Sequence, residues 1–192
     1  MSTQPVPFVT PEEYLEAERL APFKSEYVSG QVWAMSGASR AHNTIATNLI
    51  AALHAALRGG SCQVYGSDMR VYVPENITYA YPDVTIVCGP QVYIDRHADT
   101  LANPTVLIEI LSPSTAQYDR TVKFIKYRRL PSLREYVLVH QNTWHIEQFV
   151  RFDDIWLAGE CAGEGAGMEL ACVGIAVPLA DVYENVVFPT DA

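Results

Sequence analysis

Apolar residues recur at four-residue spacing along residues 40–58, and this pattern predicts a long helix with one apolar face. Ile50 and several alanines widen the face, and a Gly-Gly pair at 59–60 is a stop signal for the helix. Residues 25–36 instead alternate loosely around Ser29-Gly30, which predicts a β-hairpin. The residues that define the apolar face of the helix are Ile45, Leu49, Leu53 and Leu57.

Two further helices are predicted from signals at their N-terminal ends. The Thr-Pro-Glu-Glu stretch at 10–13 supplies an N-cap threonine, a proline at the first helical position and a glutamate three residues after the cap. A short helix is therefore expected to continue to about Leu20. Ser114 and Gln117 repeat the capping-box pattern, so another helix is expected over residues 115–130, where a proline follows.

Strands are predicted where short apolar or β-branched runs lie between turn-rich segments. Residues 158–167 are interpreted as a glycine-rich loop between short strands, and residues 177–183 as a closing helical turn. The predicted strands cover residues 62–65, 69–73, 81–88, 105–111, 135–140 and 144–150.

The composition is that of an ordinary globular protein, with 49% hydrophobic and 18% charged residues, and we expect a single domain over residues 1–192. No apolar stretch reaches the roughly 18 residues that a membrane span needs. Residues 1–5 do not begin a secretory signal, so we expect a soluble, cytoplasmic protein with no membrane partner. The four cysteines are widely spaced and are interpreted as small, reduced core residues: Cys62, Cys88, Cys161 and Cys172.

The net charge is unfavourable for binding a polyanion. Twenty-two acidic residues against thirteen basic ones give a formal charge of −9. This excess of acid argues against nucleic-acid binding unless the cations are clustered. Arg128, Arg129 and Arg134 offer a small basic rim for phosphate, although a solvated face is the favoured interpretation.

Glu109 is the most informative residue, because it interrupts an apolar run over residues 106–111 that otherwise predicts a fully buried strand. A lone buried carboxylate costs many kcal/mol unless it is protonated, paired with a cation or bound to a metal. Asp83 heads a second β-branched run, after Pro82. Alternation places Asp83 with Thr85 and Val87, and Glu109 with Leu107 and Leu111, so neighbouring strands can bring both acids together. Two such carboxylates suit Mg²⁺ or Mn²⁺.

The order of helix, strands, two acid-bearing strands, helix and strand resembles the core of the PD-(D/E)XK nuclease superfamily, with Pro82-Asp83 as the first motif and Glu109 as the second. Several stretches are also similar to the Uma-two family of “putative restriction endonucleases”. The resemblance covers roughly residues 14–140 and includes Glu26, Gly30 and His42. The stretches that carry it are Tyr81-Pro82-Asp83-Val84, residues 108–115, Asp119-Arg120, Lys123, Tyr127 and Glu135-Tyr136.

The resemblance implies an α/β fold with a restriction-endonuclease-like core, in which helices flank a mixed central β-sheet and antiparallel strands are added on the C-terminal side. It also implies a divalent-metal-dependent endonuclease, a hydrolase that cleaves phosphodiester bonds of nucleic acid, with DNA favoured as the substrate. Asp83 and Glu109 would be the catalytic metal ligands for Mg²⁺ or Mn²⁺, and a lysine would assist the attacking water.

This chain departs from the superfamily pattern at that lysine. The position two residues after the glutamate is occupied by Leu111, which carries no charge. The Uma-two pattern implies a relocated catalytic lysine, and Lys123 matches it. Asp119, Lys123 and Tyr127 follow at four-residue intervals, so they share one helix face. The supporting residues are therefore Asp119 and Tyr127, together with Glu26 as a possible further ligand and His42.

Structural interpretations of the same residues stay open. Glu109 can form a buried ion pair with Lys123 or Arg120 without any metal. Asp83 can cap a turn, Asp119 can pair with Lys123 along the helix, and Tyr127 can simply pack its ring. His42 near a helix N-terminus is more often a structural residue than a catalytic one.

Two functional alternatives follow from these interpretations. One is a catalytically silent interaction protein that keeps the nuclease fold, which is consistent with Leu111 and the charge of −9. The other is a hydrolase of small phosphorylated substrates. A homodimer is a further expectation, because the aromatic-rich segment 136–149 and the apolar C-terminal tail offer surface to bury.

Overall fold

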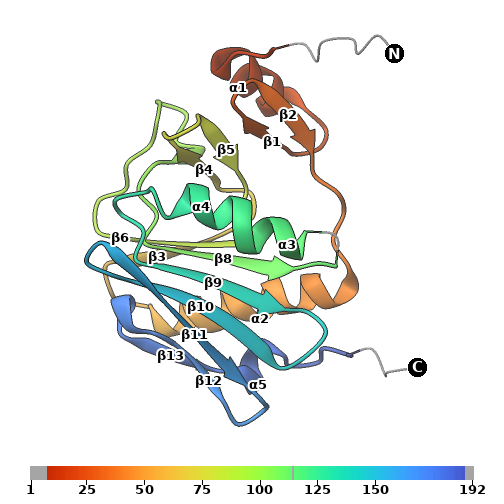
Figure 1. The fold of residues 1–192 in the computed structure, drawn as a ribbon, viewed down its shortest axis with the longest axis vertical. Coiled ribbons are helices and arrows are strands. Elements are labelled where there is room, and N and C mark those ends of the chain that lie inside the picture. The colour runs from red at the N-terminus through yellow and green to blue at the C-terminus, as the bar shows by residue number, and fades with distance from the viewer. Residues whose placement is uncertain (1–7, 114, 189–192) are drawn as a thin grey trace.

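The computed structural model describes residues 8–113 and 115–188, and its larger sheet has six strands in the order β11-β10-β9-β8-β6-β3 (Figure 1). Parallel pairing joins β8 to β9, and all other neighbours in this sheet are antiparallel. The sheet is therefore mixed, as predicted. The strands are β3 (Cys62–Gly66), β6 (Val84–Cys88), β8 (Val106–Leu111), β9 (Glu135–His140), β10 (His145–Phe152) and β11 (Ile155–Ala162).

A second, five-stranded sheet has the order β2-β1-β5-β4-β7. The predicted hairpin forms its first two strands, and the turn between them has φ of 46° at Ser29 and 92° at Gly30, as a type I′ turn requires. A separate two-stranded ribbon joins β12 (Gly167–Leu170) to β13 (Ile175–Pro178). The five strands are β1 (Ser25–Val28), β2 (Gln31–Ala34), β4 (Arg70–Val73), β5 (Thr78–Ala80) and β7 (Thr100–Leu101).

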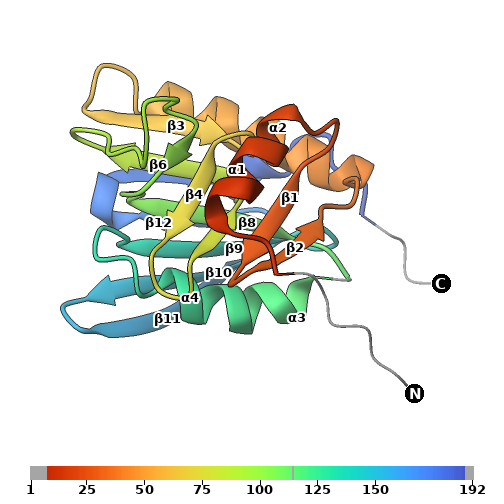
Figure 2. The same cartoon turned by 90° about the horizontal axis from the view of Figure 1, so that it is seen from above.

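Helices cover both faces of the six-stranded sheet, as Figure 2 shows from above. On one face lies α2 (Arg40–Ala56). On the other lies a continuous helix made of α3 (Ala116–Tyr118), the π-helical turn η1 (Asp119–Lys123) and α4 (Phe124–Tyr127). The remaining helices are α1 (Pro11–Leu20), the 3-10 turn η2 (Ala171–Val173) and the single turn α5 (Leu179–Val182). None of these helices has the length and apolar character that a bilayer crossing requires.

Side chains of β8 alternate between its two faces, and each face packs into a separate hydrophobic core. Ile108 and Ile110 pack into the cluster that contains the apolar face of α2. Leu107 and Leu111 belong to the opposite cluster, with Tyr127 of α4. Glu109 lies between these two leucines in the strand, so its side chain faces the helix of residues 116–127 rather than α2.

Helix starts agree with the sequence signals where the chain is described. The Thr10 side chain accepts from Glu13 N and the Glu13 side chain accepts from Thr10 N, so the predicted capping box of α1 is confirmed. The predicted cap at Ser114 lies outside the described residues, as do residues 1–5. The N-cap of this helix is Thr115, which makes no capping hydrogen bond with its side chain; the Ser112 hydroxyl accepts a hydrogen bond from Thr115 N at 3.2 Å.

Two predicted boundaries are wrong. The strand expected over residues 81–88 begins only at Val84, because Pro82 has no N–H to donate and the Asp83 side chain, not its backbone, meets β8. The loop expected over residues 158–167 is mostly strand: β11 pairs along its whole length with β10, and this pairing overrides the low strand preference of Gly159. The short strands β5 and β7 were not predicted.

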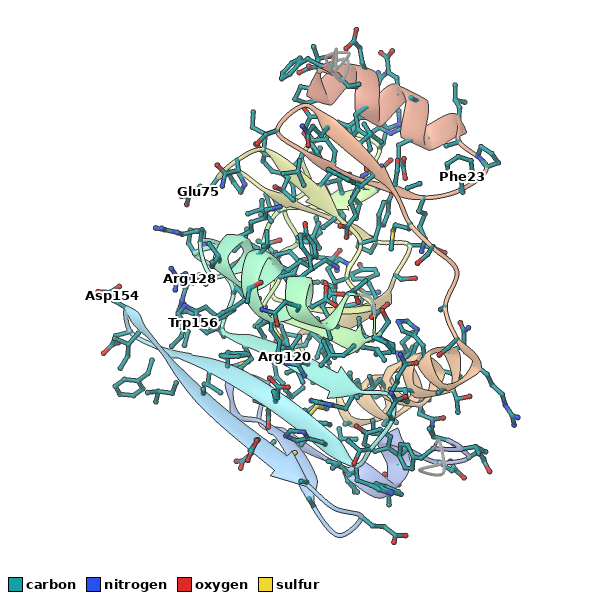
Figure 3. The ribbon with its side chains drawn as sticks, turned by 45° about the vertical axis from the view of Figure 1, so that its right-hand side comes forward. Phe23, Glu75, Arg120, Arg128, Asp154 and Trp156 are labelled. Carbon is teal, nitrogen blue, oxygen red and sulfur yellow. A yellow bond between two sulfur atoms is a disulfide. The ribbon has the colours of Figure 1, made fainter. Side chains whose placement is uncertain are left out.

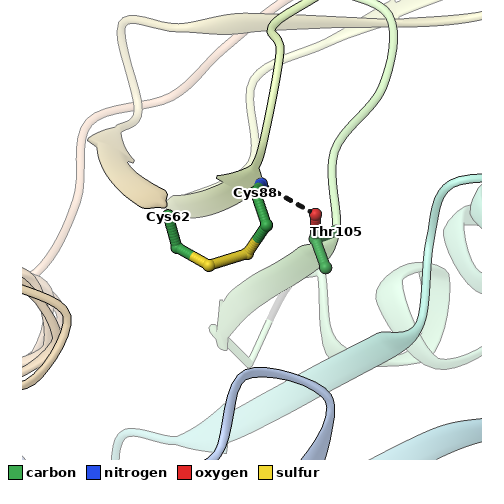
Figure 4. Close-up of a disulfide and its surroundings, with 3 residues drawn as sticks. All are labelled: Cys62, Cys88 and Thr105. Atoms are coloured by element: carbon green, nitrogen blue, oxygen red, sulfur yellow. Dashed lines mark hydrogen bonds between the residues drawn. A yellow bond between two sulfur atoms is a disulfide. The ribbon is translucent and has the colours of Figure 1, made fainter. Parts of the chain in front are cut away.

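The interpretation of the cysteines as four reduced core residues is also wrong. Cys62 and Cys88 face each other across the antiparallel pair β3 and β6 and form a disulfide (Figure 4). Thr105 supports this end of β6, since its hydroxyl accepts a hydrogen bond from Cys88 N at 3.0 Å. Cys172 is exposed rather than buried. A pairing of residues 26 positions apart depends on strand register, which the cysteine spacing does not encode.

The aromatic side chains that suggested a dimer surface are used inside the chain. Phe149 stacks on Phe124 with ring centroids 4.3 Å apart, and Phe188 packs against Trp144 and Tyr183. The homodimer therefore stays a prediction without the support of these aromatic residues.

Candidate active site

Glu109 is buried in the middle of the six-stranded sheet, with only 4% of its surface exposed. Two groups from the covering helix hold the same carboxylate oxygen. Lys123 Nζ donates to Glu109 Oε1 at 3.1 Å, and the Tyr127 hydroxyl donates to it at 3.1 Å. The other oxygen, Oε2, receives no hydrogen bond from the described residues, so it is the one left for a ligand.

Lys123 also lies within ion-pair distance of two more acids. Its Nζ is 3.3 Å from Glu26 Oε1, which comes from β1, and 3.4 Å from Asp119 Oδ1, one helical turn earlier. Neither of these buried oxygens has a hydrogen-bond partner among the described residues. Three carboxylates thus surround one ammonium group, which is more acid than a simple ion pair needs.

Burial and this crowding shift the pKa values of the cluster. Burial raises the pKa of Glu109 well above its usual range; the Lys123 ammonium opposes the shift, and the nearby Asp119, Asp83 and Glu26 carboxylates reinforce it. Burial also raises the pKa of Asp119. For Lys123, burial acts to lower the pKa, but the three carboxylates raise it well above the usual lysine range. Lys123 is therefore the group that stays charged.

The π-helical turn η1 spans Asp119 to Lys123, and π-turns inside helices are frequently found at functional sites. The Tyr136 hydroxyl of β9 anchors this turn by donating to the Asp119 carbonyl at 3.0 Å. The sequence prediction that Asp119, Lys123 and Tyr127 share one helix face is confirmed, because Lys123 and Tyr127 both contact Glu109 and Asp119 pairs with Lys123.

Asp83 lies directly beside this cluster. Val84 pairs with Ile108 across β6 and β8, so the next position in the same register sets Asp83 opposite Glu109. Asp83 Oδ2 accepts a hydrogen bond from Ile110 N at 2.7 Å, which replaces a backbone ladder bond and ends the strand. The predicted proximity of the two acids is confirmed, although Asp83 precedes the strand instead of lying within it.

His42 supports Asp83 from the first turn of α2. Its Nε2 is 3.2 Å from Asp83 Oδ2, and its backbone N–H donates to the N-cap Ser39 hydroxyl at 3.1 Å. The Ser39 hydroxyl in turn donates to Gln141 Oε1 at 2.5 Å, which links the start of α2 to the end of β9. His42 Nδ1 is buried without a partner among the described residues.

The donor set fits a hard divalent cation. Within residues 8–113 and 115–188, no three His, Cys, Asp or Glu side chains form a ready-made metal cage. Mg²⁺ rarely needs one, because it usually binds one or two carboxylates and completes its shell with water and substrate phosphates. Asp83 and Glu109 are two adjacent oxygen donors, and the cluster around them holds more carboxylates than cations.

Two neighbours of the site were missed by sequence reasoning. Lys126 Nζ donates to the Tyr118 hydroxyl at 3.3 Å. Burial raises the pKa of Tyr118, as does the Glu26 carboxylate; burial lowers the pKa of Lys126. The available signal was the helical spacing of 118, 122 and 126, one position before the spacing that was used.

Arg120, considered in the sequence analysis as a partner for Glu109, instead pairs with Glu147 at 2.7 Å.

Comparisons with known proteins agree with this architecture. The Uma2 family model, described as “Putative restriction endonuclease”, matches residues 11–180. The chain is 34% identical over 168 residues to “Uncharacterized protein sll1609” of Synechocystis sp. (strain ATCC 27184 / PCC 6803 / Kazusa), covering 87% of this chain and 95% of that protein. It is 33% identical over 186 residues to “Uncharacterized protein slr1290” of the same organism, covering 96% of each.

A solved structure shares the fold. The crystal structure of “a putative nuclease belonging to DUF820” from Anabaena variabilis ATCC 29413 superposes with a TM-score of 0.75, covering 93% of this chain and 99% of that chain. The two sequences are only 14% identical, so this likeness concerns the arrangement of the helices and strands.

Proposed function

This chain belongs to the Uma2 family, and on that premise we propose that it is a divalent-metal-dependent endonuclease that hydrolyses phosphodiester bonds of nucleic acid, with DNA as the favoured substrate. The observation that carries the proposal is the contact of Lys123 Nζ with Glu109 Oε1, beside Asp83. It brings a lysine to the acid pair although Leu111 occupies the usual lysine position.

Asp83 and Glu109 are the residues we expect to hold Mg²⁺ or Mn²⁺, with Glu26 as a further oxygen donor. A bound divalent cation would supply Lewis acidity toward a phosphoryl oxygen and lower the pKa of water. Glu109 offers Oε2 for this purpose, because Lys123 and Tyr127 already fix Oε1. His42 and Ile110 N fix Asp83 Oδ2 in the same way.

Lys123 has the properties that phosphoryl transfer requires of a cation. Its surroundings keep it protonated, so it can donate hydrogen bonds to an attacking water or to an oxygen on which negative charge develops. Its position is fixed by Glu109, Glu26 and Asp119, so little reorganisation is needed during the reaction. Tyr127 acts as a positioning residue, since it contacts Glu109.

If the chain were a catalytically silent interaction protein, Lys123 would serve only to neutralise Glu109. That interpretation accounts for one carboxylate, whereas Lys123 is in ion-pair contact with three and Asp83 adds a fourth beside them. A buried excess of acid is unfavourable in a purely structural cluster and is reasonable where a cation binds. The excess acid therefore favours the metal-dependent enzyme.

Cleavage of plasmid DNA and of a labelled RNA tests the proposal, with Mg²⁺ and with a chelator. We expect wild type to cleave only with the metal and Glu109→Gln to be at least about a hundredfold slower. Glu164→Gln removes an exposed carboxylate outside the site and should cleave like wild type. Equal rates for wild type and a folded Glu109→Gln, or cleavage that the chelator does not affect, would contradict the proposal, as would failure to cleave either polymer.

A further inference from the structure

An open cleft of about 650 Å³ lies beyond the C-terminal end of the helix that carries Lys123. Figure 3 shows Arg128 and Trp156 close together on that side of the molecule, with Asp154 on the turn between β10 and β11. Four arginines and two aspartates give the cleft an excess of positive charge in a chain of net charge −9. Its lining residues are Arg128, Arg129, Pro131, Arg134, Arg151, Asp153, Asp154 and Trp156.

The arginines of the cleft fall into two groups. Arg129 pairs with Glu75 at 3.4 Å. Arg151 donates hydrogen bonds to backbone carbonyls, among them that of Leu130. The guanidinium groups of Arg128 and Arg134, in contrast, form no ion pair or hydrogen bond within residues 8–113 and 115–188. These two cations therefore face the cleft without an acidic partner, although acids outnumber bases in the chain as a whole.

Arg151 makes this end of the helix suitable for an anion. A helix C-terminus carries partial negative charge on its free carbonyls and normally repels anions. Arg151 donates to the carbonyl of Arg128, the C-cap residue of α4, and to those of Leu130 at 2.9 Å and Pro131 at 3.2 Å in the segment that follows. The negative end is thus covered by a guanidinium group, and the cleft keeps its positive character.

Trp156 gives the cleft a fixed wall. Its ring lies 4.9 Å from the Arg151 guanidinium, and its edge packs on Phe124 with centroids 5.4 Å apart. The pKa of Arg151 is lowered by burial and by the like charge of Arg134, while Asp154 opposes the shift. Arg151 N donates to the Arg134 carbonyl at 2.8 Å, so the two residues are held side by side in the lining of the cleft, where guanidinium groups can bind one anion together.

We propose that this cleft binds a backbone phosphate of the nucleic acid, with Arg128 and Arg134 as its donors. The identity of the ligand rests on the proposed endonuclease function. Arg128 follows Lys123 by five positions, about 7.5 Å along the helix axis, and at 3.6 residues per turn the two side chains leave the helix on different sides. The cleft is therefore a contact for a phosphate away from the cleavage position, on a strand that passes the C-terminal end of the helix.

Binding of fluorescein-labelled duplex DNA, measured by fluorescence anisotropy in a chelator so that no strand is cleaved, tests this site. The variant Arg128→Ala with Arg134→Ala should bind at least about tenfold more weakly than wild type, and the slope of log affinity against log salt should fall by about 0.9 for each lost contact. The matched control is Arg58→Ala with Arg96→Ala, which removes the same charge from exposed positions outside the cleft and should stay within about twofold of wild type.

A double lysine variant, Arg128→Lys with Arg134→Lys, guards against a folding defect because it keeps the charge. It should bind DNA more tightly than the alanine variant but more weakly than wild type, since lysine cannot form the two-pronged contact of a guanidinium group. Equal affinity of wild type and the alanine variant would overturn the inference, as would an equal loss in the control or no DNA binding by wild type.

Binding and cleavage are measured separately, so the two proposals fail in different ways. Wild type that binds DNA through the cleft but never cleaves nucleic acid contradicts the endonuclease and leaves the phosphate site standing. Cleavage by wild type combined with unchanged DNA affinity in the alanine variant overturns the phosphate site alone. If inorganic phosphate protects the cleft arginines from a guanidine-modifying reagent but duplex DNA does not, the nucleic-acid assignment is wrong.

Discussion

Lys123 donates a hydrogen bond to Glu109 from a helix that begins only after the strand bearing Glu109 has ended, and the two atoms lie 3.1 Å apart. The superfamily pattern puts the lysine two residues after the glutamate, on the same strand. Here the two residues are 14 positions apart, and the covering helix replaces the strand as the source of the cation. Leu111 is free to pack in the core beneath that helix.

Replacing Lys123 by methionine should destabilise the protein by about 3–5 kcal/mol, because it leaves buried carboxylates without their cation. Mn²⁺ should recover part of this loss, since the metal binds the same acids. Urea denaturation with and without Mn²⁺ measures both effects. Lys24→Met, which removes an ion pair with the exposed Asp68, should change the unfolding free energy by less than about 1 kcal/mol. A Lys123→Met protein as stable as wild type would contradict the role of Lys123 as the cation that neutralises the buried carboxylates.

Tyr127→Phe removes one of the two hydrogen bonds that fix Glu109 Oε1. We expect a loss of about 1.5–3 kcal/mol in the free energy of unfolding and a roughly 10–100-fold lower affinity for Mn²⁺, the usual effect of losing a group that orients a metal ligand. Tyr14→Phe is the matched control, because its hydroxyl also donates a buried hydrogen bond, to the Ser25 carbonyl, but in the other sheet. Equal Mn²⁺ affinities for the two variants would show that Tyr127 only packs.

Stability in the absence of metal should depend on pH in a direction set by Glu109. Burial raises its pKa well above the usual range, so the folded protein holds a proton that the unfolded chain releases. The contribution of this group is fully present below its unfolded pKa of about 4.3 and is lost as the pH rises through the folded value. The stability of wild type relative to Glu109→Gln should therefore fall as the pH rises from about 4 to 8.

Urea denaturation in a chelator at several pH values measures this difference. Asp119 has a pKa raised by burial as well, but it is present in both proteins, so only its interaction with Glu109 adds to the difference. A difference that stays constant or increases with pH would mean that Glu109 is ionised throughout, with Lys123 fully compensating for its burial.

Loss of the disulfide should affect stability without affecting the site. Cys62→Ser with Cys88→Ser should lower the free energy of unfolding by about 2–4 kcal/mol, because the bond joins residues 26 positions apart and restricts the unfolded chain. Cys161→Ser with Cys172→Ser, which removes the two free thiols, is the control. Intact mass after thiol labelling reports the bond directly; two labelled thiols in the control variant would contradict it.

Much of the candidate site could be predicted from the sequence because its signals are local. A carboxylate inside an apolar strand indicates that a partner is needed, and four-residue spacing brings Asp119, Lys123 and Tyr127 to one helix face. Alternation along β8 fixes the face of Glu109 without knowledge of the rest of the chain. The capping box of α1 and the type I′ turn at Ser29-Gly30 are local in the same sense.

The features that were missed depend on contacts between distant segments. Asp83 ends its strand because its carboxylate accepts the Ile110 N–H, which lies 27 positions later. The disulfide depends on the register of β3 against β6, and the length of β11 on its pairing with β10. The basic cleft was predicted in part: the sequence indicates Arg128, Arg129 and Arg134 as a basic rim, but not Arg151 and Trp156, which come from the β10–β11 hairpin. No periodicity within one segment encodes these arrangements.

The most direct test of the central claim, that Asp83 and Glu109 form a divalent-metal site, is a calorimetric titration of Mn²⁺ into wild type and Glu109→Gln. It requires no knowledge of the nucleic-acid substrate, and circular dichroism checks that the variant is folded. We predict that wild type binds Mn²⁺ and that the variant loses this binding. Equal Mn²⁺ affinity in both proteins, or no binding by wild type, would contradict the account and leave Glu109 and Lys123 as a structural ion pair.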